Sequence, residues 1–99
     1  MNQMQQMLMN AQRMQRELQK AHAELAATEF KASKAGMVEV TMMGDRSVKD
    51  IQIDKDALDP ENAEDLQEAI RLALNDCLEK INAANDAIEE RITGKTGLF

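Results

Sequence analysis

The most conspicuous shortage in this sequence is that of aromatic side chains. Its 99 residues include two Phe and no Trp or Tyr. Proteins that hold single-stranded nucleic acids without sequence preference stack the bases on aromatic rings. The composition argues against that kind of recognition. The chain also has a single Cys and a single His. These exclude an internal disulfide and argue against a zinc site of the usual Cys/His type.

Long apolar runs are missing as well. None approaches the ~18–20 residues that a membrane span needs, and no basic segment precedes an apolar core as in a signal peptide. We therefore expect a cytoplasmic protein with no membrane partner, built as a single domain over residues 1–99. His22 has no nucleophile or orienting group beside it in any recognisable motif. We expect no enzymatic activity, no metal, no cofactor and no small-molecule substrate.

Positive charge is scarce overall and is distributed unevenly. Residues 1–49 hold seven Lys or Arg and five Asp or Glu, a balance of +2. Residues 50–99 hold five and thirteen, a balance of −8, which leaves the whole chain at −6. If the partner is an anion such as nucleic acid, the first half should meet it, because the second half repels it.

Gly and Pro are both absent before Gly36, and apolar residues recur there at alternating spacings of three and four. This heptad seam predicts a coiled-coil-like helix over residues 2–28, ~40 Å long. The seam consists of Met4, Met7, Ala11, Met14, Leu18, Ala21 and Leu25.

The predicted first helix carries a row of basic residues on the face opposite the seam. Arg13, Arg16 and Lys20 are spaced by three and four residues, and Lys31 and Lys34 extend the basic region beyond the helix. Such a stripe can neutralise phosphates by simple charge. The alternative reading is an ordinary solvated helix face followed by loop or edge-strand lysines.

The pattern of apolar residues in the middle of the chain predicts strands. Residues 28–33 are predicted to form a short strand with Phe30 and Ala32 on one face. A hairpin follows over residues 36–54, with a turn at 43–47. Its apolar residues alternate on both sides of the turn, and Val48 is out of phase, which suggests a bulge. We expect the alternating set to form the core against which the helices anchor: Val38, Val40, Met42, Ile51 and Ile53.

A second long helix is predicted from Asp59-Pro60-Glu61, which supplies a cap, a first-turn Pro and an acid for the helix dipole. Its apolar stripe contains Cys77, which we expect to be a buried, inert thiol, and runs to Ile92 before Gly94 stops the helix. Helices of ~40 and ~48 Å must protrude from a domain whose compact radius of gyration is ~13 Å. Two copies of the chain are the simplest way to cover such helices.

The ordered set of motifs resembles the YbaB/EbfC family of small bacterial nucleoid-associated proteins, over nearly the whole chain. The matching motifs are Gly36-x-Val38-x-Val40-x-x-x-Gly44, Val48-x-x-Ile51-x-Ile53-Asp54, Glu64-Asp65-Leu66 and Ala73-Leu74-Asn75-Asp76. The resemblance implies an α+β protomer of order α-β-β-β-α and a tweezer-like homodimer. It also implies binding to double-stranded DNA in the nucleoid with little sequence specificity and without catalysis.

Two functions follow as hypotheses. In the first, a homodimer contacts the DNA backbone through Arg13, Arg16, Lys20, Lys31 and Lys34. In the second, the protein is an adaptor that binds other proteins and no DNA, which the net charge of −6 favours. Salt-dependent binding to DNA separates the two.

Overall fold

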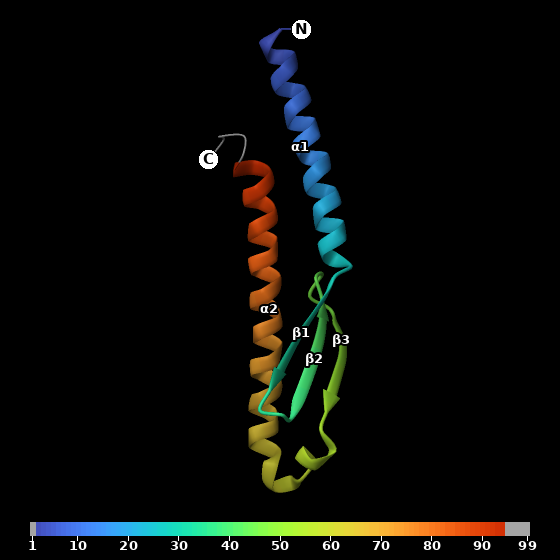
Figure 1. The fold of residues 1–99 in the computed structure, drawn as a ribbon, viewed down its shortest axis with the longest axis vertical. Helices are drawn as coiled ribbons and strands as arrows, with labels where there is room; N and C mark the ends of the chain where they lie inside the picture. Colours follow the sequence, from blue (N-terminus) through green and yellow to red (C-terminus); the bar gives the residue numbers. More distant parts are fainter. Residues whose placement is uncertain (1, 95–99) are drawn as a thin grey trace.

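The computed structural model describes residues 2–94, and Figure 1 shows a long helix, three strands and a second long helix in that order. The strands form one antiparallel sheet in the order β1-β2-β3. The predicted α+β class and the α-β-β-β-α order are both confirmed. The elements are α1 (Gln3–Ala26), β1 (Glu29–Lys34), β2 (Val38–Met43), β3 (Val48–Ile53) and α2 (Ala63–Thr93).

Helix α1 begins with a reciprocal cap. The Asn2 side chain accepts a hydrogen bond from the Gln5 backbone N–H at 2.8 Å, and the Gln5 side chain accepts one in turn from the Asn2 backbone N–H. This arrangement satisfies two amides that have no partner within the helix. The helix ends two residues before the predicted limit, where the Thr28 hydroxyl donates to the Glu24 carbonyl at 2.7 Å. The predicted first strand is confirmed one residue further along.

The predicted bulge is present between β2 and β3. Met42 pairs with Val48 and Thr41 pairs with Asp50, so that Lys49 is the extra residue on the outer strand. A bulge of this kind shifts the phase of the alternation by one. This is why Val48 falls on the same face of the sheet as Ile51, although an odd number of positions separates them.

Helix α2 begins later than the sequence predicted. Asp59 caps a short 3-10 turn at Pro60–Asn62 (η2), accepting a hydrogen bond from the Glu61 N–H at 2.9 Å, and regular α-helix starts at Ala63. Asp54 caps a similar turn at Lys55–Ala57 (η1). The predicted capping role of Asp59 is confirmed, but Asp59 caps a 3-10 turn and not the first turn of α2.

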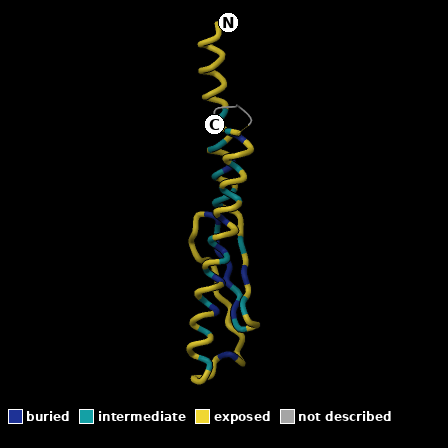
Figure 2. The backbone as a smooth tube through the Cα atoms, turned by 90° about the vertical axis from the view of Figure 1, so that its left-hand side faces the viewer, coloured by how far each residue is buried: buried dark blue, intermediate teal, exposed yellow. Residues whose placement is uncertain are grey.

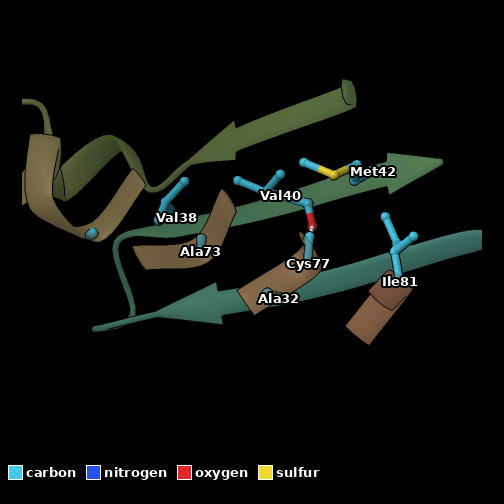
Figure 3. Close-up of a cluster of buried hydrophobic side chains, with 8 residues drawn as sticks. Ala32, Val38, Val40, Met42, Ala73, Cys77 and Ile81 are labelled. Atoms are coloured by element: carbon cyan, nitrogen blue, oxygen red, sulfur yellow. Dashed lines mark hydrogen bonds between the residues drawn. The ribbon is translucent and has the colours of Figure 1, made fainter. Parts of the chain in front are cut away.

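The core lies between α2 and the first two strands. Figure 3 shows Val38, Val40 and Met42 of β2 facing α2, as predicted. The Cys77 thiol is fully buried between α2 and the sheet, with its Sγ 3.7 Å from the Val40 carbonyl oxygen. Burial raises the pKa of this thiol above its ordinary value. The prediction of a buried Cys77 is confirmed.

The prediction that Ile51 and Ile53 belong to this core is wrong for the single chain. Their exposed fractions are 42% and 37%. They share a sheet face with Val40 and Val38, but β3 lies on the side of the sheet farther from α2 (Figure 1). A helix is ~10 Å wide and strands lie ~4.8 Å apart, so one helix covers about two strands. The third strand is left uncovered.

The molecule is long and thin. Its radius of gyration is 19.7 Å and its extents are 71 × 21 × 13 Å, whereas a compact domain of this length has a radius near ~13 Å. Helices α1 and α2 run antiparallel, and α1 extends beyond the end of α2, so that its first turns are exposed on all sides (Figures 1 and 2). The predicted protrusion of the helices is confirmed. Within residues 2–94, no helix is both long and apolar enough to cross a membrane.

Candidate nucleic-acid interface

Three basic side chains project from the middle of α1. Arg13, Arg16 and Lys20 are all exposed, and within the described part of the chain none of them makes a hydrogen bond or an ion pair. A guanidinium or ammonium group without a protein partner keeps its full charge for an external anion. These side chains therefore form the largest group of uncompensated cations on a single element of the described chain.

Arg13 and Lys20 lie on the rim of a groove between α1 and the last turns of α2, with a volume of about 990 Å³. Arg91 reaches the same groove from α2, and the seam residues Met7 and Met14 line it. The two basic residues therefore flank the apolar seam, although the sequence placed them opposite to it. With Met4 at heptad position a, Arg13 and Lys20 occupy position c, and the seam residues Met7 and Met14 occupy position d. Position c precedes position d by one residue, or ~100° around the helix, so a groove wider than the seam includes residues at both positions.

The groove also contains acidic side chains. Glu17 and Glu24 also line it, and both follow Arg13 along α1. Carboxylates so close to the cations reduce the local positive potential. An anion bound here would need direct contact with the guanidinium and ammonium groups, because the field at longer range is weak.

Lys31 and Lys34 on β1 differ in their surroundings. Lys34 Nζ lies 2.6 Å from Asp76 Oδ2 on α2, and both side chains are about one-third exposed. The charge of Lys34 is therefore largely compensated. Lys31 remains exposed, and its backbone carbonyl accepts a hydrogen bond from Lys80 Nζ at 2.6 Å.

Lys80 was missed by the sequence reasoning. It lies in the acidic half of the chain, but α2 brings its ammonium group to β1, next to Lys31. The sequence places Asp76 and Lys80 one helical turn apart, and therefore on one face of the helix, but it does not show which strand that face meets. The α1 stripe and this second basic group follow one another along the molecule's long axis, because β1 continues from the end of α1 (Figure 1). They do not form one cluster.

The remaining polar groups of the described chain form no alternative site. Lys49 is held by Glu29, and the hydrogen bond that Lys49 donates lowers the pKa of the Glu29 carboxyl. Among residues 2–94, no group of three or more His, Cys, Asp or Glu side chains is arranged to hold a metal ion. The Nε2 atom of His22 is buried without a hydrogen-bond partner in the same part of the chain.

Known proteins resemble this chain over almost its full length. The model of the YbaB/EbfC DNA-binding family matches residues 1–96. A nucleoid-associated protein of Chloroflexus aurantiacus is 42% identical, over 98% of this chain and 94% of the relative. Similar proteins of the same name are 39% identical in Enterococcus faecalis, over 88% and 85% of the two chains, and 37% identical in Lactococcus lactis, over 84% and 85%. The chain belongs to the YbaB/EbfC DNA-binding family.

Proposed function

We propose that this protein binds double-stranded DNA in the nucleoid as a homodimer, through backbone contacts with little sequence specificity. It thereby alters DNA conformation and affects nucleoid organisation and gene expression. The observation that carries the proposal is the set of exposed, unpaired cations on one protruding helix of a DNA-binding family member. The role is binding and not catalysis. Arg13, Arg16 and Lys20 are the main phosphate contacts, and Lys31 is secondary. Lys34 contributes least, because Asp76 already neutralises it.

The net charge decides what kind of binding is possible. A dimer of chains at −6 carries −12 and is repelled by DNA at long range. At physiological salt this repulsion is screened beyond ~8 Å, whereas direct contacts between a cation and a phosphate persist. Each such contact releases counterions from the DNA. The result is binding that is weak at physiological salt and falls steeply as salt rises.

The uncovered strand β3 is the surface that we propose for the dimer. It is an edge strand with free backbone groups, and Val48, Ile51 and Ile53 expose their side chains on the face that α2 covers elsewhere. An exposed apolar edge of this kind pairs readily with another strand. Two copies related by a two-fold axis can join their sheets at β3. This pairing would place the two α1 arms at a fixed separation, as in tweezers.

An adaptor that binds proteins and no DNA is the second candidate. The observations that favour it are the acidic charge of the chain and the exposed apolar residues of β3 and of α1. Both candidates predict a stable, folded protein, so stability measurements do not separate them. Direct binding to DNA does.

A gel-shift titration with a DNA duplex at two salt concentrations tests the proposal. The Arg13→Ala/Lys20→Ala variant should bind more weakly at low salt. Its binding should also depend less on salt, by about one unit of log–log slope for each phosphate that the variant no longer neutralises. The matched control is Lys55→Ala/Arg71→Ala, which removes the same charge from exposed positions on η1 and α2.

Three results would bear on the assignment. Weaker binding by the α1 variant alone supports the α1 stripe as the contact surface. If the two variants lose affinity equally, net charge and not the α1 stripe governs binding. If the wild-type protein binds no DNA even at low salt, the adaptor is the better reading.

A further inference from the structure

The first turns of α1 differ chemically from the rest of the molecule. We define the α1 tip as residues 2–12, which contain no Asp, Glu, Lys, Arg or His. The first charged side chain of the helix is that of Arg13. Elsewhere the sequence is rich in charge, with 30 charged residues (12 Lys or Arg and 18 Asp or Glu) in 99 positions. The tip is therefore the one long uncharged stretch on a strongly charged chain.

The tip exposes large apolar side chains. Met4, Met7 and Leu8 have exposed fractions of 78%, 67% and 60%. Met7 lines the groove between α1 and the last turns of α2, to which Ile92 also contributes. Met4 and Leu8 are one helical turn apart, and both are exposed. The first turns of α1 extend beyond the end of α2 and are exposed throughout (Figures 1 and 2). Apolar side chains gathered in this way mark interaction surfaces.

The chemistry of the tip identifies its partner. DNA is a polyanion, and an uncharged tip offers it no counter-charge, whereas Arg13, Arg16 and Lys20 begin directly below. Two copies of this acidic chain repel each other wherever their charged surfaces meet, but two tips can approach without that repulsion. The heptad spacing of Met4, Met7, Ala11 and Met14 continues through the tip and suits another helix of the same pattern. Gln side chains around it donate and accept hydrogen bonds, so identical tips can pair.

We propose that the α1 tips of two dimers pack against each other and join the dimers through their arms. This inference rests on the homodimer proposed above and adds a second, separate interface to it. The β3 edge holds each dimer, and the tips connect one dimer with the next. Two DNA-bound dimers joined in this way would hold two DNA segments together.

The test is the molar mass of the full chain, measured by sedimentation velocity and light scattering over a wide range of protein concentration. The wild type should move from dimer toward tetramer as concentration rises, and added salt should not weaken this step, because the contact is apolar. Met4→Gln/Leu8→Gln should remain dimeric throughout. Gln is already frequent in the tip and is a good helix former, and circular dichroism checks that the helix is retained. Met9→Gln is the matched control, because Met9 points to another side of the helix, and it should associate like the wild type.

Each other outcome overturns the proposal in a recognisable way. A wild type that stays dimeric at every concentration refutes tip pairing and leaves the dimer intact. A double variant that falls apart to monomers places the tip in the dimer interface itself. A double variant with unchanged mass but weaker DNA binding assigns the tip to DNA. A wild type that is monomeric at all concentrations refutes the homodimer on which the inference rests.

Discussion

Replacing Gly44 with Ala tests the close contact between the β2–β3 turn and the end of α1, which fixes the position of α1 relative to the sheet. Gly44 lies at the turn between β2 and β3 and is buried against the end of α1. Its backbone N–H donates to the Thr28 carbonyl at 2.9 Å, just before β1 begins. A Cβ atom added at this position would lie 1.8 Å from the Leu25 carbonyl oxygen and 2.5 Å from its carbon. Both atoms belong to the backbone, so neither can move aside as a side chain would.

The expected loss in the free energy of unfolding depends on which contacts must change to accommodate the new Cβ atom. The hairpin turn has to move off α1 to relieve the overlap, and overpacking of this kind has a typical cost of ~1–3 kcal/mol. The hydrogen bond from Gly44 to Thr28 is strained or broken at a further ~1 kcal/mol. We therefore expect the free energy of unfolding to fall by about 2–4 kcal/mol. In a chain of this length that corresponds to a decrease in Tm on the order of 10–30 °C.

The assay is thermal and urea unfolding at fixed protein concentration, with Gly36→Ala as the control. Gly36 has a positive φ of 67°, but an added Cβ meets nothing within 4 Å. The control therefore carries conformational strain without a clash, which costs ~1 kcal/mol. Gly44→Ala should be clearly the more destabilising of the two. If it is equally or less harmful than the control, the close approach between the turn and α1 is not what fixes the arm.

Two further substitutions and one chemical probe test the account. Ile51→Glu on the exposed apolar edge of β3 should convert the dimer to a monomer, as measured by light scattering. Gln52→Glu adds the same charge on the opposite sheet face and should leave the dimer intact. If the two variants behave alike, the dimer does not form through β3. The Cys77 thiol should react far more slowly with a thiol reagent in the folded protein than in urea. Burial hides it and raises its pKa, so that little thiolate exists at mildly alkaline pH, and fast labelling of the native protein would contradict its placement in the core.

Much of the fold could be predicted because its local patterns agree with one another. The heptad spacing of α1, the alternation of Val38 and Val40 and the phase shift at Val48 each indicate one structure, and each was found. The boundaries at Asp59 and Ala63 could not be predicted, since a cap before Pro fits a 3-10 turn as well as an α-helix. Local pattern does not distinguish the two.

What the sequence could not predict depends on which surfaces meet. Alternation placed Ile51 on the correct face of the sheet, but only the position of α2 over β1 and β2 shows that this part of the face is uncovered. Likewise Lys34 could not be matched with Asp76, or Lys80 with the carbonyl of Lys31, because a long stretch of sequence separates the partners in each case. The candidate cations could be named from spacing. Their availability to DNA required the fold.

The most direct test of the central claim is the salt dependence of DNA affinity for the wild type and for Arg13→Ala/Arg16→Ala/Lys20→Ala. The three α1 cations of each chain, if all contact phosphates in a dimer, predict a slope of log K against log salt concentration of about −5. The triple variant, still dimeric by mass, should lose most of that slope together with most of its affinity at low salt. A slope that the triple substitution leaves unchanged would contradict the assignment of DNA binding to the α1 stripe.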